Sequence, residues 1–372
     1  MKNKKEKNST IELWRFILTV AIAIGHLNSF IWRATGEKLI FTGGRFLAFF
    51  MFLSGYFLMA HYQSHKKEKT MPSTRAWKYT GRRISALYPA LLGGVTFAFL
   101  VRNIISKTKL TDYFAIFMDS IFEFLGLSQI GLVGLIEPKT AVFEAIPGVS
   151  TLWNGPLWYI SALILCGFIL YYIVAKSEDF FNFFAVIFII ITYGGVGLTE
   201  LGWDRSAISV LGFSNGIARV MAGMCLGMLL YYVVEYFQKK KFSETLMLTF
   251  SFLHIGLALF IIYIWINGAV WNEFVYGLIL LIFTAILLIN KDYIAVLYNK
   301  SNLCNFLGRL SLYYYANHIV FVFLIAHLFP QMDYHASLIF NILFTTCWSF
   351  IMLYIDDYVI TPIFRSKKAS VK

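Results

Sequence analysis

The chain has 372 residues, of which 59% are hydrophobic and only 14% are charged, and its mean hydropathy is +0.68. These values exclude an ordinary soluble globular domain and indicate several membrane-spanning segments. The net charge of +12 is also found in nucleic-acid-binding proteins. Here, however, the basic residues fall between the apolar runs, so we expect a lipid bilayer and no nucleic acid as partner.

Ten apolar runs are each long enough to cross a bilayer as a helix, because about 20 residues span the hydrocarbon core. They lie at residues 13–31, 43–60, 84–101, 153–175, 180–198, 216–237, 246–267, 271–290, 311–330 and 336–355. An even number of spans returns the chain to its starting side. We therefore predict an all-α polytopic integral membrane protein, with ten transmembrane helices forming one bundle around an interior tunnel.

The distribution of basic residues sets the predicted orientation. With a cytosolic amino terminus, 22 of the 32 lysines and arginines fall on the inner side, nine on the outer side, and Arg15 within the first span. This bias predicts two cytosolic termini, in a multi-pass protein of the plasma membrane. The predicted parts are a basic cytosolic tail (1–12), a transmembrane domain (13–355) and a second basic cytosolic tail (356–372).

The segment 102–152 forms a long outer loop in this topology. Its acidic residues Asp112, Asp119 and Glu123 are seven and four residues apart, which places them on one face of a helix. We therefore expect residues 110–126 to form an amphipathic helix on the outer surface.

The first span carries two ionisable residues, Arg15 and His26, in an otherwise apolar run. Each costs on the order of 3 kcal/mol at membrane depth. Eleven residues are about three helical turns, so the two side chains share one face roughly 16 Å apart. This favours one wall of a functional cavity, although His26 alone fits helix packing and Arg15 alone can reach the inner headgroups.

Two further stretches combine small, basic and aromatic residues. Ser54 and Gly55 interrupt an aromatic run and allow close approach of a helix or a thin ligand. Arg82 and Arg83 end a basic inner segment and suit phosphate binding, although ordinary contact with anionic lipid explains them as well.

The fourth and ninth spans supply the remaining candidates. A turn at 154–156 brings Trp158 and Tyr159 to a helix start, where their rings suit either sugar stacking or interfacial anchoring. His318 is buried in an apolar run and suits either a substrate contact or a structural hydrogen bond. The four cysteines are scattered singly without metal-ligand spacing, so we expect neither a metal nor a permanently bound cofactor.

These motifs, in this order, resemble the acyltransferase family 3 membrane proteins, which O-acetylate cell-surface polysaccharides and related acceptors. The likeness covers nearly the whole chain. It rests on Arg15 and His26 in the first span, Phe49 to Tyr56, Arg82 to Tyr88 and Pro89, Leu157-Trp158, and Gly308, Ser311, Tyr313 and His318.

The chain also departs from the family pattern. Leu163 stands where many members have a glutamate, Ala86 replaces the second arginine of the arginine-rich motif, and Ala48 replaces an acidic residue. A role for those side chains therefore cannot be transferred. The sequence has no carboxy-terminal hydrolase-like domain of the kind found in fused members.

The resemblance implies an acyl-CoA donor, most simply acetyl-CoA, and a glycan acceptor. It implies His26 and Arg15 as catalytic residues, His26 either deprotonating the acceptor hydroxyl or carrying the acyl group. Donor contacts are expected from Arg82, Arg83, Ser54 and Tyr88, and acceptor contacts from Asn28, Trp158, Tyr159 and His318. The alternatives are a transporter or flippase of a lipid-linked saccharide, and a non-catalytic sensor; the expected protein partners are a second copy of the chain or a glycan-biosynthesis protein.

Overall fold

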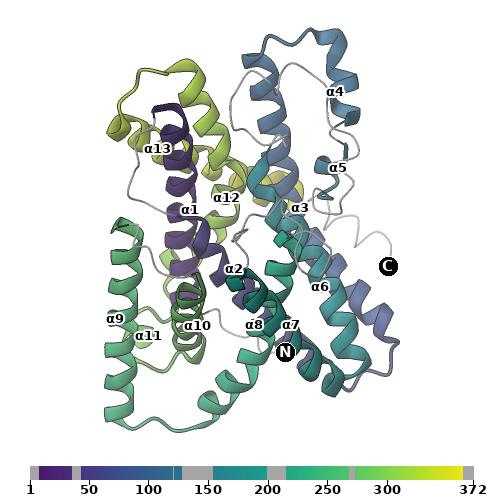
Figure 1. The fold of residues 1–372 in the computed structure, drawn as a ribbon, viewed down its shortest axis with the longest axis vertical. Helices are drawn as coiled ribbons and strands as arrows, with labels where there is room; N and C mark the ends of the chain where they lie inside the picture. The colour runs from purple at the N-terminus through teal and green to yellow at the C-terminus, as the bar shows by residue number, and fades with distance from the viewer. Residues whose placement is uncertain are drawn as a thin grey trace. The chain divides into compact units, whose positions relative to one another are not determined.

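The computed structural model describes residues 8–35, 43–119, 121–127, 154–198, 215–267 and 273–362. Within these ranges every regular element is helical and no strand occurs. Nine of the described helices are long and apolar enough to cross a membrane, and the 17-residue α10 is apolar but shorter. The prediction of an all-α polytopic membrane protein is confirmed, and the helices follow the ten predicted spans in order (Figure 1).

The long helices are α1 (Ser9–Thr35), α2 (Leu47–Ser64), α3 (Pro72–Ile105), α6 (Trp158–Lys176), α7 (Glu178–Leu198), α8 (Asn215–Lys239), α9 (Glu244–Asn267), α10 (Glu273–Ile289), α12 (Asn302–Leu328) and α13 (Tyr334–Ile355). The short elements are η1 (Gly44–Phe46), η2 (Leu110–Asp112), α4 (Tyr113–Asp119), α5 (Ile121–Phe124), η3 (Gly155–Leu157), α11 (Tyr293–Leu297) and the π-helical turn η4 (Asp356–Ile360).

Helix α3 is longer than the predicted third span. It begins at Pro72, a residue suited to the first turn of a helix, and runs for 34 residues. At ~1.5 Å per residue this exceeds a ~30 Å hydrocarbon core by several turns. Arg82 and Arg83 therefore lie on a helix and not in a loop.

The prediction that Glu123 lies on the polar outer face of a helix over 110–126 is wrong. The chain there forms η2, α4 and α5, and it turns at Gly126 with a φ of +71°. Glu123 is buried, and its carboxylate accepts a hydrogen bond from the backbone N–H of Asn154 at 2.6 Å. The sequence pattern treated Glu123 as part of a polar outer face, whereas it is an internal acceptor.

The chain divides into two compact units. Unit 1 contains residues 1–15, 44–84 and 159–305, and unit 2 contains residues 16–43, 85–158 and 306–372. Each unit is described by itself below.

Unit 1 is built around the close crossing of α2 and α8. A Cβ atom at Gly55 of α2 would lie 2.0 Å from the carbonyl oxygen of Met224, and one at Gly227 of α8 would lie 2.1 Å from that of Phe52. The two backbones are therefore in direct contact, as in small-residue packing of membrane helices. The small residue next to Ser54 is explained by helix packing.

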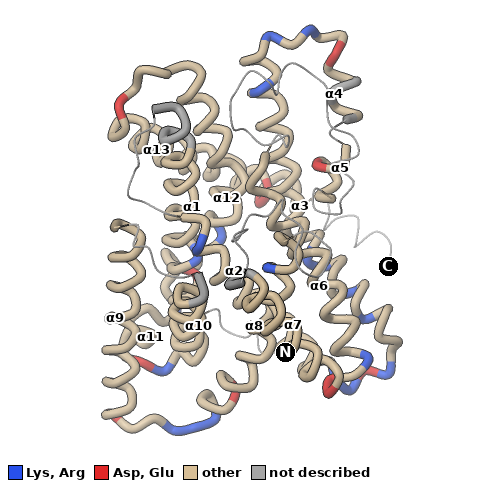
Figure 2. Tube along the Cα trace, in the orientation of Figure 1, with Lys and Arg blue, Asp and Glu red and all other residues tan. Residues whose placement is uncertain are grey.

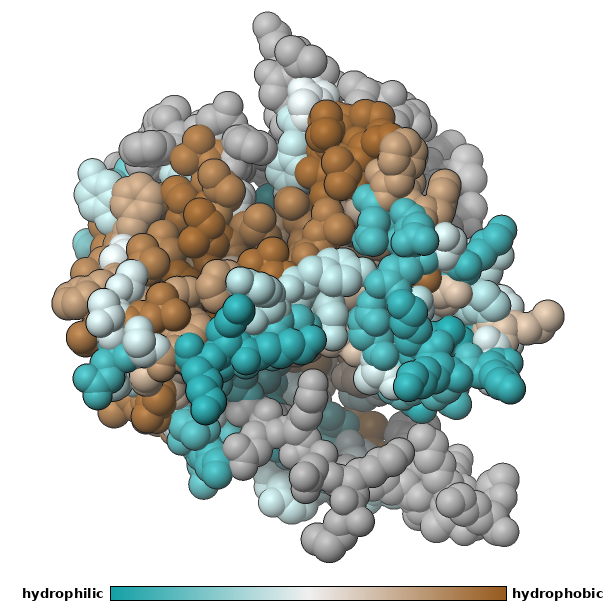
Figure 3. Space-filling view, turned by 90° about the horizontal axis from the view of Figure 1, so that it is seen from below, coloured by the Kyte–Doolittle hydropathy of each residue, from teal (hydrophilic) through white to brown (hydrophobic). Residues whose placement is uncertain are grey.

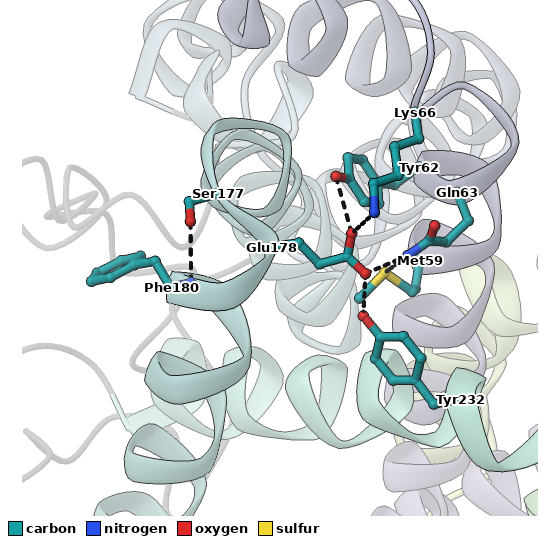
Figure 4. Close-up of polar contacts among 8 residues, drawn as sticks. All are labelled: Met59, Tyr62, Gln63, Lys66, Ser177, Glu178, Phe180 and Tyr232. Atoms are coloured by element: carbon teal, nitrogen blue, oxygen red, sulfur yellow. Dashed lines mark hydrogen bonds and ion pairs between the residues drawn. The ribbon is translucent and has the colours of Figure 1, made fainter.

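A carboxylate ties the ends of three helices together in unit 1 (Figure 4). Glu178, the first residue of α7, accepts hydrogen bonds from Gln63, Lys66 and Tyr232 at 2.6 Å each, and from Tyr62 at 3.3 Å. The hydrogen bond to Glu178 raises the pKa of Lys66 above its ordinary value. A negative charge at a helix start is also favoured by the helix dipole.

Basic residues gather at one end of unit 1. Three lysines precede α3, and three lie at the end of α8 and just after it, near the lower end of Figure 2. They are Lys66, Lys67, Lys69, Lys239, Lys240 and Lys241. Seen from below, hydrophilic residues form teal patches beside brown apolar ones (Figure 3). We expect this end to face the cytosol.

In unit 2, α13 buries a polar stripe. Ser337, Asn341, Thr345 and Ser349 recur every four residues and are at most 1% exposed. Large apolar residues such as Phe350 on other faces are exposed, as expected for a helix facing lipid. The small polar side chains allow α13 to pack closely within the unit.

Candidate functional site

Two histidines meet inside unit 2. The rings of His26 on α1 and His318 on α12 have centroids 5.2 Å apart, with 33° between their planes. His318 is fully buried, whereas His26 is half-buried. Two residues distant in the sequence thus form one imidazole pair, and His26 is its more accessible member.

The backbone fixes the orientation of His318. Its Nδ1 lies 2.7 Å from the carbonyl oxygen of Tyr315. Because a carbonyl only accepts, Nδ1 carries the hydrogen, and in the neutral ring Nε2 is left with a lone pair. No described residue forms a hydrogen bond with Nε2. The arrangement presents a hydrogen-bond acceptor or base beside His26.

A buried asparagine supports this part of α12. The side-chain amide of Asn154 donates to the carbonyl of Ala316 at 2.7 Å and to that of Gly94 at 3.3 Å. The hydroxyl of Tyr315 donates to the carbonyl of Pro156 at 2.5 Å. The 154–156 segment therefore joins α3 to α12 within two residues of His318, and Asn154 lies in the interior of the unit, not at its surface.

The other predicted residues of unit 2 are spread around this pair. Asn28 is buried on α1 close to the hydroxyl of Tyr334. Trp158 is 6% exposed, which disfavours interfacial anchoring. The hydroxyl of Tyr88 donates a hydrogen bond to the carbonyl of Phe124 at 3.2 Å, so it already has a partner within the protein.

A second group of predicted residues meets in unit 1 around Tyr159. The charges of Arg83 and Arg15 act on its hydroxyl, and the Ser54 hydroxyl lies beside it. Tyr159 is buried and Arg83 is half-buried. The unit thus places two guanidinium groups near two hydroxyls, a combination suited to a polar, anionic ligand.

Arg15 has a local partner that the sequence analysis did not weigh. Its Nη1 lies 2.8 Å from Oε2 of Glu12, one turn earlier on α1, and its side chain is 32% exposed. The ion pair reduces the cost of placing an arginine near the membrane, so Arg15 by itself is weaker evidence of function than its position alone indicates.

Arg82 and Arg83 do not form one binding site. They are consecutive on α3, and about 100° of rotation separates them. Arg82 is exposed, and its Nη1 lies 3.5 Å from Nε2 of His61. His61 also contacts the hydroxyl of Tyr171 at 3.3 Å. Arg82 therefore belongs to the surface cluster at the end of α2, while the Arg83 guanidinium lies 5.9 Å from the ring centre of Tyr79.

Sequence reasoning missed the buried arginine Arg75. It is 7% exposed on the first turns of α3. A predicted inner loop gave no reason to expect a buried guanidinium there; only the extended helix brings it inside. Within the described ranges no cluster of three histidine, cysteine or acidic residues offers a metal site.

The described helices and the imidazole pair define a multi-pass helical membrane protein with two histidines in contact inside one unit. A family model described as an acyltransferase domain matches residues 8–354. The chain therefore belongs to this acyltransferase family, the one its motifs resemble, and is a multi-pass membrane acyltransferase. Neither the curated proteins nor the solved structures contain a match.

Proposed function

We propose that the protein transfers an acyl group, most simply acetyl, from cytosolic acyl-CoA to a hydroxyl of a cell-surface or lipid-linked glycan. The protein would reside in the plasma membrane with both termini in the cytosol, and the acyl group would cross the bilayer. The observation that carries this proposal is the pairing of His26 with His318 inside the acyltransferase domain.

The pair suits hydroxyl activation. His26, the more accessible ring, takes the proton of the acceptor hydroxyl, and the oxygen attacks the thioester carbonyl. The C–S bond breaks, and the thiolate of coenzyme A takes that proton from His26. His318, held by the bond from its Nδ1 to the carbonyl of Tyr315, packs its ring against that of His26 and limits the positions that His26 can take.

A covalent route uses the same residues. The unprotonated nitrogen of His26 attacks the thioester, the C–S bond breaks, and the departing thiolate takes the proton of the other ring nitrogen; the acceptor hydroxyl then attacks the acyl-imidazole, and its proton returns to the imidazole as the C–N bond breaks. Rapid acid quenching with radiolabelled acetyl-CoA in the absence of acceptor separates the routes. Only the covalent route leaves label on wild-type protein that is missing from His26→Ala.

On the donor side, Arg83, Arg15, Ser54 and Tyr159 form the polar group that would hold the donor's pantetheine arm in unit 1. Trp158 and Asn28 are retained as acceptor contacts in unit 2. The family assignment supports acyl transfer in preference to the transporter and sensor alternatives.

The test uses purified protein in lipid nanodiscs with radiolabelled acetyl-CoA and candidate glycans. His26→Ala and His318→Ala should each lower transfer at least ~100-fold, the usual minimum for loss of a proton-transferring group. His327→Ala is the matched control, because His327 lies on the same α12 but is exposed. Full transfer by His26→Ala, or thioester use that needs no acceptor and no histidine, would refute the proposal.

A further inference from the structure

The first turns of α3 hold an arginine whose binding capacity is unused. Arg75 is 7% exposed, and its Nε and Nη2 atoms have no hydrogen-bond partner among the residues that the structure describes. These two atoms form one edge of the guanidinium plane, the edge that binds an oxyanion through two parallel hydrogen bonds. A buried donor without an acceptor typically costs about 1–3 kcal/mol, more for a charged group. The unsatisfied edge points to a missing acceptor.

The described part of the chain does not provide the missing negative charge. Among the described residues no carboxylate lies within ion-pair distance of Arg75. Two acidic residues of the same unit are engaged with other partners. Glu178 accepts four hydrogen bonds, and Glu68 lies 3.9 Å from His65. An aromatic ring contacts Arg75 instead: its guanidinium lies 5.4 Å from the ring centre of Tyr62.

The surroundings add positive potential. The first turn of α3 has no acidic residue, so the positive end of its dipole is not offset. Exposed basic side chains lie on the preceding segment and on the next turns of the helix, at Lys66, Lys67, Lys69, Lys78 and Arg82. An isolated buried cation in this setting is costly, and an anion removes that cost.

We propose that Arg75 is the centre of a phosphate-binding site at this end of unit 1, distinct from Arg83 and Tyr159. The ligand is a phosphate ester, bound side-on by Nε and Nη2, with the first turn of α3 and nearby lysines completing its coordination. Exposed residues flank Arg75 at Ser73, Thr74 and Lys78, so a small rotation of its side chain brings the free edge to the surface.

Two sources supply this chemistry. One is a soluble phosphorylated donor such as coenzyme A, in which case the inference rests on the proposed function and locates the donor's phosphates. The other is the phosphodiester of an anionic lipid. Carboxylates are less suitable, because the surplus of basic groups around Arg75 favours a ligand of higher charge.

The test measures thermal unfolding and affinity in nanodiscs. Coenzyme A and pyrophosphate are titrated in neutral phosphatidylcholine, and coenzyme-free protein is compared between neutral discs and discs with phosphatidylglycerol. Arg75→Gln removes the charge and the fork, Arg75→Lys keeps only the charge, and Lys78→Gln is the control from the exposed side of the same helix.

If the soluble ligand is correct, Arg75→Gln should weaken coenzyme A and pyrophosphate binding at least tenfold, Arg75→Lys by several-fold, and Lys78→Gln by less than threefold. If the lipid is correct, phosphatidylglycerol should raise the unfolding temperature of wild type but not of Arg75→Gln. Equal responses of wild type and both Arg75 variants to all three phosphates would overturn the proposal. These measurements need no turnover. Unchanged coenzyme A and pyrophosphate binding by His26→Ala would show that the phosphate site is independent of the transfer mechanism.

Discussion

Asn154 is the residue whose substitution most directly tests the packing beneath the histidine pair. Its amide nitrogen donates to two backbone carbonyls, at 2.7 Å to Ala316 and 3.3 Å to Gly94. Asn154→Ala removes two hydrogen bonds of about 1 kcal/mol each, so we expect a loss of about 2 kcal/mol in the free energy of unfolding. Asn154→Asp has nearly the same size, but it replaces the donor with an acceptor oxygen that faces two carbonyls, and it adds a buried charge near Glu123.

Side-chain size alone would make Asn154→Ala the less stable variant, whereas we expect Asn154→Asp to be the less stable of the two. Asn154→Asp should be about 3 kcal/mol more destabilising than Asn154→Ala, because a buried, unpaired carboxylate costs several kcal/mol. Denaturant titration of the purified protein in mixed micelles measures both changes. The exposed Asn299→Asp is the control and should stay within about 0.5 kcal/mol of wild type. An aspartate variant as stable as the alanine variant would refute the donor role assigned to Asn154.

Three further predictions concern unit 1. Gly55→Ala should lower the free energy of unfolding by at least about 3 kcal/mol, because a Cβ would lie 2.0 Å from the carbonyl oxygen of Met224. Gly256→Ala is the control in the same denaturant titration. A Cβ there would have no described atom within 4 Å, so this variant should be neutral or slightly stabilising. Glu178→Gln should release α2 from α7 and lower the temperature at which a protease cleaves the loop before α3; an unchanged cleavage profile would contradict its role as a clamp. Asp292→Ala removes the cap of α11, in which Oδ1 accepts from the N–H of Ala295 at 2.8 Å, and should cost about 1 kcal/mol, measurable as faster hydrogen exchange in α11.

The spans were predictable because a bilayer allows little else. A run of about 20 apolar residues has to satisfy its backbone internally, so hydropathy identifies a helix without knowledge of its neighbours. Hydropathy does not identify a helix through a charged segment. It therefore placed the start of the third span at residue 84, whereas α3 starts at Pro72. It also failed at 110–126, because the bond between Glu123 and Asn154 joins segments that no local period connects.

The candidate site was predictable residue by residue but not as an arrangement. His26 and His318 are each conspicuous as ionisable groups in apolar runs, yet only the fold brings their rings to 5.2 Å. The sequence suggested different partners for them, a hydroxyl for one and a substrate contact for the other. Arg75 could not be singled out at all, because a basic segment gives no indication of which guanidinium is buried.

The crossing of α2 and α8 has a consequence for biosynthesis. Helix α2 is complete about 175 residues before α8 is, so its glycine face meets the bilayer long before its partner exists. Bare backbone at Gly55 cannot be covered well by bulky acyl chains. The unfinished protein must cover the backbone at Gly55 in some other way until residue 239 has been made. Quality control has that interval in which to remove chains that stall.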